Sequence, residues 1–596
     1  MKSGVLKRIL SYVGKYKGQL TCAIICGLLG TIFTILAPSI LGNITTILYE
    51  GIVDGDWFSQ DDVYISIGGY ELGKVGTIVL IMIILVVLYV VAWIFSMISN
   101  NLFARISAKT VRDIRSDIDA KMHRMKLNYY DTRTNGEILS VITNDVDAIN
   151  TALGKNMYNA VTQIFTAIGI LVMMLTINGW LTLVAIAMVP VTMLASGSII
   201  KLSSKNYNMQ QNLLGDLNGY VEEMFDGQNV VSSFNYQEKA KKGFYEINDN
   251  LQSKAKKAEG YAGSVMPVTQ AVNNIGYAIS ALIGCMMALS GTISIGNVQS
   301  IIQYTKSFSQ PFTTFAQMSG QLSAAGAAGK RVFELLDAEE EIPDPEKGEI
   351  PTVTDGAVTF EHVQFGYLPD KLLMQDVSIN VKSGQKCAIV GPTGAGKTTL
   401  INLLMRFYEI NGGKITVDGV DTTKMTRHEL RKHFGMVLQD TWLFEGTIKD
   451  NLKYSTEREV SDEEIKKAAE SVCADSFIRT MPGGYDMVLS KGAENISQGQ
   501  RQLLTIARAI IADPEIMILD EATSNVDAHT EQIIQDAMAT LMKGRTSFVI
   551  AHRLSTIRDA DMILYMENGD IKEVGNHDQL MELGGKYAVL YNSQFA

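Results

Sequence analysis

Cysteine is scarce in this chain, and its five cysteines form no C-x-x-C pair. Most of them lie in apolar runs, where a small buried thiol is the ordinary role, so the sequence indicates neither a disulfide framework nor a metal site. A cleavable signal peptide is lacking too, because the first apolar run is too long for its hydrophobic region and no small-residue cleavage site stands out. The cysteines are Cys22, Cys26, Cys285, Cys387 and Cys473.

Basic residues are also fewer than acidic residues, 52 against 63. The formal net charge is −11 and the pI about 5.3, which argues against nucleic acid as the main partner. At 596 residues the chain is too long for one core and corresponds to about three or four domain equivalents. The hydrophobic share of 47% is high for a soluble protein with this much charge, and the first half of the chain carries the excess.

Long apolar runs explain that excess. A helix needs roughly 20 mostly apolar residues to cross the hydrocarbon layer, and four runs qualify well. Two weaker runs contain polar residues, so they are either a soluble helical hairpin or membrane helices whose polar faces line an aqueous cavity. We favour the second interpretation, because amide and ammonium groups facing lipid are costly. The six predicted helices are at about 20–41, 78–98, 161–177, 180–200, 265–289 and 298–322, and the polar residues of the last two include Gln270, Asn273, Asn274, Gln303, Lys306, Gln310 and Gln317.

The flanking charges predict the orientation of these helices. The N-terminal segment is basic, whereas the loop after the first helix is acidic, and basic flanks stay on the cytoplasmic side. Six crossings return the chain to the cytoplasm. The segments 101–155 and 201–260 contain apolar residues at helical spacing and almost no proline, so we expect helical extensions into the cytoplasm rather than flexible charged linkers.

The stretch Gly391–Thr399 reads GPTGAGKTT and follows an apolar strand, Cys387–Val390. A run suited to a helix, Thr399–Met405, comes after it. Glycines let such a loop wrap a phosphate with its N–H groups and the helix N-terminus. Lys397 would neutralise the β- and γ-phosphates, and the Thr398 hydroxyl would hold Mg²⁺. The alternative, a glycine-rich turn with an exposed lysine, accounts less well for the flanking strand and helix.

The residues around this loop predict an α/β domain. An acidic, proline-containing stretch at 331–355 is interpreted as a linker, and strand-like and helical runs alternate beyond it. One apolar strand, Ile516–Glu521, ends in two carboxylates, Asp520 and Glu521. One carboxylate could hold Mg²⁺ and the other could polarise the attacking water, although acids at a helix N-terminus are favoured anyway. The nearby phosphate loop favours the functional interpretation. A similar strand, Ser547–Ala551, leads to His552.

Taken together, these motifs resemble the ATP-binding cassette (ABC) exporters over essentially the entire chain. The resemblance implies a half-transporter: an all-α transmembrane domain of six helices with long intracellular helical loops (1–330), a linker (331–355) and an α/β P-loop NTPase domain (356–596). It also implies that ATP and Mg²⁺ are the cofactors. By resemblance, the nucleotide-binding residues are Tyr367, Gly391, Thr393, Gly394, Gly396, Lys397, Thr398, Thr399 and Gln439; Thr398, Gln439 and Asp520 hold the metal; and Glu521, His552 and Lys397 form the catalytic set.

Within this resemblance, Tyr367 stacks on the adenine ring, Gln439 senses the γ-phosphate and His552 is the switch histidine. The loop Ser524–Asp527 crosses the seam between two nucleotide-binding domains. Two intracellular loops resemble those that carry motion between the ATPase and the membrane, and we place their tip helices near Asn128–Asn135 and Gly219–Gln228.

One motif departs from the family. The signature L-S-G-G-Q is Ile496-Ser497-Gln498-Gly499-Gln500 here, so a glutamine replaces the first glycine. This loop meets the ATP held by the opposite subunit, and a side chain at a close approach should hinder that contact. Because this chain's own hydrolytic residues are complete, it resembles the subunit that keeps the catalytic glutamate in the bacterial heterodimeric multidrug exporters with one degenerate site. That resemblance implies a second half-transporter as partner, with an intact signature and a defective catalytic carboxylate. A homodimer that tolerates Gln498 is the alternative.

The expected function is therefore ATP-driven export of hydrophobic or amphipathic compounds, as in multidrug efflux, from a multi-pass protein of the bacterial cell membrane. The partners are the second half-transporter, the lipid bilayer and a small-molecule substrate, with no nucleic acid. A lipid or lipopeptide flippase is the nearest alternative; peptide export is disfavoured, because no N-terminal protease-like domain is visible. A regulatory ATP sensor or an ATP-gated channel is disfavoured by the complete hydrolytic set.

Overall fold

The computed structural model describes residues 3–54, 65–67, 70–352, 354–368, 371–438, 441–456, 458–520, 527–551 and 557–595. The chain forms two compact units. The first, called the membrane unit here, contains Met1–Arg124 and Arg133–Ala338. The second, the ATPase unit, contains Met125–Thr132 and Glu339–Ala596, so a short segment from the first half of the chain belongs to it.

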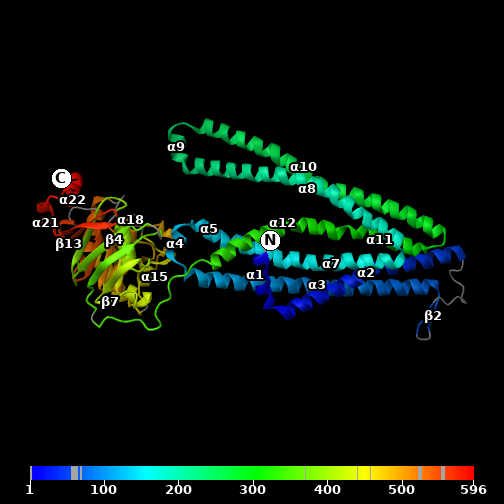
Figure 1. Ribbon diagram of the computed structural model, residues 1–596, viewed down its shortest axis with the longest axis horizontal. Helices are drawn as coiled ribbons and strands as arrows, with labels where there is room; N and C mark the ends of the chain where they lie inside the picture. The colour runs from blue at the N-terminus through cyan, green and yellow to red at the C-terminus, as the bar shows by residue number, and fades with distance from the viewer. Residues whose placement is uncertain are drawn as a thin grey trace. The chain divides into compact units, whose positions relative to one another are not determined.

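Long helices make up most of the membrane unit, because its apolar runs are continuous and its few prolines do not end the helices that contain them. Figure 1 shows α8 and α10 lying along one another, with α9 between their ends. The helices are α1 (Ser3–Gly14), α2 (Lys17–Asp54), α3 (Lys74–Met122), α5 (Asn135–Ser140), α6 (Val146–Thr151), α7 (Met157–Ile177), α8 (Gly179–Asp226), α9 (Gln228–Ser233), α10 (Gln237–Leu289), α11 (Ile295–Phe308) and α12 (Gln310–Leu336).

Five helical segments among the described residues are long and apolar enough to cross a membrane. They are Lys17–Val53, Lys74–Met122, Asn135–Ile177, Gly179–Asp226 and Gln237–Leu289. The run predicted as a sixth helix, 298–322, is divided between α11 and α12, which meet at Ser309 just before Pro311. Proline cannot donate the next backbone hydrogen bond of a continuing helix, so a break here has a local cause. Six crossings remain a prediction.

Two other expectations for the membrane unit need correction. It is not entirely α-helical, because β1 (Ile65–Ile67) and β2 (Tyr70–Leu72) pair as an antiparallel hairpin after α2. Two π-helical turns also interrupt the first intracellular extension, η1 (Val141–Asp145) and η2 (Ala152–Asn156). Such turns are rare and leave no clear sequence signal.

The tip of each intracellular loop also differs from its expected range. The first tip helix is α4 (Leu127–Asp131), at the beginning of the range predicted for it. The second, α9, begins at Gln228, where the predicted range ends, because α8 continues to Asp226 and the chain turns at Gly227. The linker prediction began too early, since α12 continues to Leu336.

The contact between α2 and α11 depends on small and hydroxyl side chains. Gly42 of α2 and Gly296 of α11 lie so close that a Cβ atom on either would collide with the other's backbone. One turn further along, the Ser300 hydroxyl donates to the Pro38 carbonyl oxygen at 2.9 Å, and the Tyr304 hydroxyl donates to the Ile35 carbonyl oxygen at 2.7 Å. Small residues and interhelical hydrogen bonds of this kind hold membrane helices together where lipid removes the hydrophobic driving force.

The ATPase unit contains a mixed six-stranded sheet in the order β14-β13-β5-β12-β11-β8. Strands β13, β5, β12, β11 and β8 run parallel, and β14 is antiparallel to β13. A second, antiparallel sheet has the order β4-β3-β6-β7. The strands are β3 (Val358–Phe365), β4 (Met374–Val381), β5 (Lys386–Val390), β6 (Gly412–Val417), β7 (Val420–Asp421), β8 (Phe434–Val437), β11 (Ile516–Asp520), β12 (Thr546–Ile550), β13 (Met562–Glu567) and β14 (Asp570–Gly575); β9 (Gly446–Thr447) and β10 (Val488–Leu489) form a separate pair.

The parallel strands of the six-stranded sheet are buried on both faces and are mainly apolar in sequence, whereas the edge strand β14 is not. In β11, Met517 and Leu519 belong to one core, together with residues of α16, α18 and α19. Ile516 and Ile518 belong to the other core, with residues of α13 and the antiparallel sheet. The helices are α13 (Lys397–Leu404), α14 (Arg427–Lys432), α15 (Ile448–Lys453), α16 (Asp462–Ser471), α17 (Ala474–Thr480), α18 (Gln498–Ala512), α19 (Ala528–Met542), α21 (His577–Leu583) and α22 (Lys586–Phe595).

The close approach of α2 and α11 gives a test of the membrane unit. Gly42→Ala should lower the melting temperature of the detergent-purified protein by several degrees, because overpacking a tight contact costs about 1–3 kcal/mol. The matched control is Gly197→Ala in α8, where a Cβ atom would meet nothing within 4 Å. That substitution should be neutral or gain up to about 1 kcal/mol from helix propensity. Equal melting temperatures for the two variants, measured by scanning fluorimetry, would contradict the contact.

Candidate functional site

The parallel strands of the ATPase unit end together at one edge of the sheet. Val390 ends β5 and leads into the glycine-rich loop, whereas Asp520 ends β11. Register pairs Asp520 with Ile550, the last residue of β12, and Leu519 with Val437, the last residue of β8. Ligands of open α/β sheets bind at the carboxyl ends of such strands.

A cavity of about 390 Å³ lies at this edge. It brings together the predicted phosphate-binding residues and the predicted metal aspartate. Ala395 of the glycine-rich loop also lines it, as do Leu373 and Ile550, to which sequence analysis gave no role at the site. The predicted residues that line it are Tyr367, Thr393, Gly394, Gly396, Lys397, Thr398, Thr399 and Asp520.

Glycine is required at two points of the loop. Gly391 has a φ of +152°, and a Cβ atom there would collide with the Met566 carbonyl oxygen. Gly396 has a φ of +101° and forms the N-cap of α13, so the first N–H groups of that helix face the loop. This geometry exposes backbone donors where a phosphate can approach closely. The helix begins at Lys397, two residues earlier than the sequence suggested.

The Lys397 ammonium lies over the loop, donating to the Gly391 carbonyl oxygen at 2.7 Å and the Pro392 carbonyl oxygen at 3.1 Å. Burial lowers the pKa of this ammonium from its ordinary value, and the nearby Asp520 carboxylate opposes that shift. The Lys397 ammonium is partly desolvated and donates here to neutral carbonyl oxygens. An anion such as a phosphate would form stronger, charge-assisted hydrogen bonds with it.

The oxygen donors of the cavity fit Mg²⁺. Thr398 and Asp520 supply a hydroxyl and a carboxylate in one cavity, and within the described ranges no three His, Cys, Asp or Glu side chains cluster as a metal site. Mg²⁺ is usually held by one or two protein oxygens together with substrate phosphates. Its binding here would therefore depend on a nucleotide.

Tyr367 closes one side of the cavity, and its position follows from an aromatic cluster. Its hydroxyl lies 2.9 Å from the Thr399 hydroxyl oxygen. Its ring makes edge contacts with Phe365, at 4.9 Å between centroids, and Tyr408, at 5.2 Å. The Tyr408 hydroxyl donates to the carboxylate of Asp131 in α4. Burial first, and this hydrogen bond second, raise the pKa of Tyr408.

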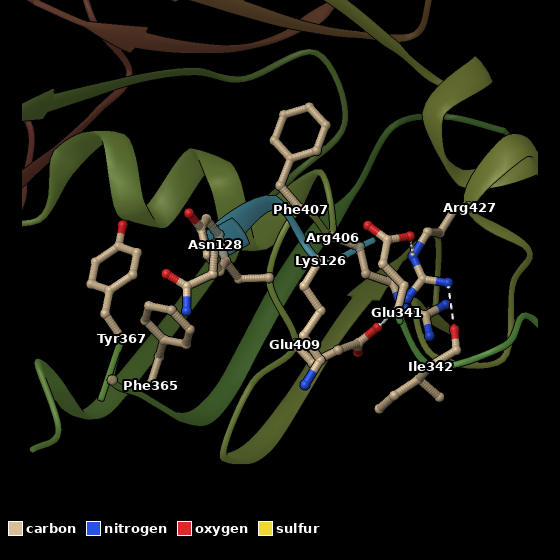
Figure 2. Close-up of a pocket in the computed structure, with 12 residues that line it drawn as sticks. Lys126, Asn128, Glu341, Ile342, Phe365, Tyr367, Arg406, Phe407, Glu409 and Arg427 are labelled. Atoms are coloured by element: carbon tan, nitrogen blue, oxygen red, sulfur yellow. Dashed lines mark hydrogen bonds and ion pairs between the residues drawn. The ribbon is translucent and has the colours of Figure 1, made fainter. Parts of the chain in front are cut away.

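Figure 2 shows the pocket beside this cluster, where Tyr367 and Phe365 lie toward one end and Arg406 and Arg427 toward the other. Arg427 donates to the Ile342 carbonyl oxygen at 2.8 Å and pairs with Asp344 at 2.6 Å. These contacts hold the acidic linker against the ATPase unit. Sequence analysis missed both Tyr408 and this arginine cluster, because their partners lie far away in the chain.

The signature residues lie apart from the cavity, and none of the four lines it. Ser497 is the N-cap of α18, and Gln498 is its first residue. The Ser497 hydroxyl accepts from the Gln500 N–H at 3.3 Å, and the Gln500 side chain accepts from the Ser497 N–H at 2.9 Å. This capping box places Gln498 and the buried Gly499 at a helix N-terminus.

Asp527 also lies outside the cavity, as the N-cap of α19. Its carboxylate accepts from the N–H groups of His529 and Thr530, and the bond from Thr530 in particular keeps the pKa of Asp527 below its ordinary value. Gln439, Glu521, His552 and the rest of the predicted seam loop, Ser524–Val526, lie outside the described residues. In the sequence, Gln439, Glu521 and His552 follow the ends of β8, β11 and β12. Ser524–Val526 come directly before Asp527.

Comparison with known proteins decides the family. Residues 20–312 match the ABC transporter transmembrane region and residues 374–524 match the ABC transporter ATPase domain. A "Fatty acid ABC transporter ATP-binding/permease protein" of Mycobacterium bovis is 38% identical over 98% of this chain and 95% of its own. The chain belongs to the ABC transporter family.

Further relatives agree with that assignment. A "Probable multidrug resistance ABC transporter ATP-binding/permease protein" of Bacillus subtilis is 33% identical over 86% of this chain and 77% of its own. The solved structure of a bacterial Atm1-family ABC exporter with ATP bound has a TM-score of 0.75 and 26% identity, covering 97% of this chain and 98% of its own. This ABC transporter is thus an ATP-hydrolysing half-transporter with the exporter fold, which works as a dimer in a membrane.

Tyr367 offers a test of the nucleotide site. Tyr367→Ala should weaken binding of a fluorescent ATP analogue roughly five- to hundredfold, because an aromatic–base stack is worth about 1–3 kcal/mol. Tyr367→Phe keeps the ring and loses only the contact with Thr399, so its affinity should equal or exceed that of the wild type. Equal weakening by both substitutions would contradict a stacking role and would assign the effect to the hydroxyl.

Proposed function

We propose that this ABC transporter exports hydrophobic or amphipathic compounds across the bacterial cell membrane by alternating access. The observation that carries the proposal is a cavity of about 120 Å³ among the membrane helices, where uncharged polar groups meet apolar side chains. Such mixed lining suits amphipathic ligands. Its polar members are Ser196, Thr269, Gln270, Thr313 and Gln317, and its apolar members are Ile200, Val265 and Met266.

Gln270 and Gln317 belong to the two apolar runs whose polar residues we expected to line an aqueous space. They come from α10 and α12, and a buried hydrogen bond of 2.8 Å between Ser196 and Thr269 joins α8 to α10 beside them. No charged side chain is among the described residues that line this cavity. A ligand there meets hydrogen-bonding groups without a fixed charge, which favours compounds that are mainly apolar.

The proposed work of the ATP site follows from its residues. Lys397 would leave the loop carbonyls for the β- and γ-phosphates, and the N–H groups of the loop would hold the remaining phosphate oxygens. Thr398, Asp520 and Gln439 would hold Mg²⁺, which offsets the charge of the phosphates when bound. Glu521 would polarise the attacking water and His552 would contact the γ-phosphate. Binding of two ATP molecules stabilises the closed dimer, because ATP binds that state more tightly.

We further propose that the partner is an unlike half-transporter. Gln498 lies at the N-terminus of α18, where the family has a glycine that approaches ATP. A homodimer would carry this side chain at both sites. In a heterodimer, the partner's intact signature would meet this chain's Lys397, Asp520 and Glu521, and only that site would hydrolyse ATP rapidly.

The exposed tip of the second intracellular loop is consistent with a partner subunit. Phe225 and Phe234 are 78% and 79% exposed, and Val230 between them is 61% exposed. Three large apolar side chains beside α9 have no cover within the membrane unit, and exposed apolar patches of this kind mark protein interfaces. The proposed orientation places this tip, the N-terminus and the ATPase unit in the cytoplasm.

Lipid or fatty-acid export is the second candidate function. The relative named as a fatty acid transporter matches nearly the whole chain, and the relative named as a multidrug transporter matches somewhat less of it. Both substrate classes are apolar molecules with a polar end. The choice between them rests on experiment.

The heterodimer is tested by its composition and by which site hydrolyses ATP. When purified from its native membrane, the tagged chain should be found at a 1:1 ratio with a second ABC half-transporter. Glu521→Gln in this chain should lower ATP hydrolysis by at least about a hundredfold, because it removes the general base, yet leave ATP binding intact. A substitution at the corresponding carboxylate position of the partner should change turnover little. A stable homodimer of this chain with two equally active sites would disprove the heterodimer.

The substrate class is tested by stimulation of ATP hydrolysis in nanodiscs. Amphipathic drugs should raise turnover severalfold, and Gln270→Leu should raise the half-maximal drug concentration roughly two- to tenfold, the range of one hydrogen bond. The matched control is Gln252→Leu, on the same helix but outside the cavity, which should behave as the wild type. Stimulation by fatty acids or lipids alone would favour the second candidate function, and absence of any turnover would contradict transport.

A further inference from the structure

A second cavity of the membrane unit, of about 220 Å³, lies beneath α1. Helix α1, the π turn η2 with the start of α7, and the middle of α12 surround it. Eleven of the twelve described residues that line it are apolar, and Asn156 is the exception. We call it the α1 cavity; the apolar residues are Leu6, Ile9, Leu10, Ile149, Ala152, Leu153, Met157, Ala160, Met318, Leu322 and Ala325.

Asn156 is the feature of this cavity that needs explanation. Its side chain is 2% exposed, and its amide nitrogen Nδ2 has no hydrogen-bond partner among the described residues. Buried polar atoms in native proteins almost always have a partner, so an exception points to a group that is absent from the chain itself. Asn156 is also the last residue of η2, and single π turns of this kind occur frequently at functional sites.

The chemistry of the cavity narrows what can fill it. A buried water needs two to four polar partners, and among the described residues this cavity offers one amide. A leucine or phenylalanine side chain from another protein would fill the space but would leave Nδ2 unpartnered. An aliphatic chain that carries a hydrogen-bond acceptor satisfies both features.

The volume of the α1 cavity and its position beside α1 indicate the length and the source of such a chain. A cavity of roughly 150 Å³ holds the six carbons of benzene, so about 220 Å³ accommodates roughly nine carbons of a chain. Helix α1 turns Leu6, Ile9 and Leu10 toward the cavity and also carries Lys7 and Arg8. An amphipathic basic helix of this kind lies in the interfacial layer of a membrane, where the ester groups of phospholipids are found.

We propose that the α1 cavity binds one acyl chain of a phospholipid from the adjacent leaflet, and that its ester carbonyl accepts a hydrogen bond from Nδ2 of Asn156. The bound chain fills the space between α1, α7 and α12. This site is separate from the cavity beside Gln270 and does not depend on which compound is transported.

The test uses a phospholipid with a photoreactive diazirine near the ester end of one acyl chain. The full-length transporter, with its partner subunit, is reconstituted in nanodiscs containing this lipid, irradiated and mapped by mass spectrometry. Adducts should concentrate on the peptides that contain Leu6–Leu10 and Ala152–Ala160, at several times the level found on the exposed face of α3 at Ile83–Val90. The wild-type map is decisive without any variant: adducts on α3 alone would disprove the site.

Two kinds of substitution test the residues, one that removes the donor and one that fills the cavity. Asn156→Leu keeps the volume and removes the donor, so labelling of the α1 cavity should fall roughly two- to tenfold; Asn159→Leu, outside the lining, is the matched control. Ala152→Phe or Ala325→Trp should fill the cavity and abolish its labelling, with labelling of α3 unchanged as evidence of intact insertion. Equal labelling of the Asn156 and Asn159 variants would overturn the hydrogen bond. Cross-links to a partner peptide, or labelling by a photoreactive free fatty acid but not by the phospholipid, would overturn the choice of ligand.

Discussion

The alignment of parallel strand ends is the constraint on which the ATP site depends. Main-chain pairing places the last residues of β5, β12, β11 and β8 beside one another. Lys397 and the loop donors follow β5, and Asp520 ends β11, so separate stretches of the chain meet in the described cavity. His552, Glu521 and Gln439, which we propose for the same site, follow β12, β11 and β8 in the sequence. Burial of both sheet faces, as in Met517 and Ile518 of β11, fixes the register that aligns the strand ends.

A different force organises the membrane unit. Lipid gives no hydrophobic gain for helix association, so close backbone contact and hydrogen bonding must supply it. At the contact between α2 and α11, Gly42 and Gly296 let the backbones touch, and the hydroxyls of Ser300 and Tyr304 donate to the carbonyl oxygens of Pro38 and Ile35. The proline that weakens the hydrogen bonding of α2 thus lies where α11 supplies donors.

Sequence analysis predicted best where the signal is local. Strand β11, Ile516–Asp520, lies within the predicted strand Ile516–Glu521 and begins at the predicted residue, because its apolar run is buried. The loop Gly391–Thr399 was likewise evident, since its glycines are imposed by backbone geometry. Sequence analysis did not predict the π turns η1 and η2 or the hairpin after α2, because π turns leave no clear sequence signal and strands of three residues show little alternation. The bond between Tyr408 and Asp131 joins residues 277 positions apart, and no pattern along the chain announces it.

The difference between local sequence signals and tertiary contacts also explains why one cavity of the membrane unit could be predicted from the sequence and the other could not. Gln270 and Gln317 stood out because amides are unexpected in apolar runs, so a polar cavity was foreseeable. Asn156 did not, because it lies in a polar extension where asparagine is ordinary. Only folding makes it exceptional, by surrounding it with α1, α7 and α12 and leaving Nδ2 without a described partner. A buried donor without a partner among the described residues is an energetic cost, and an acceptor supplied by the membrane would remove it.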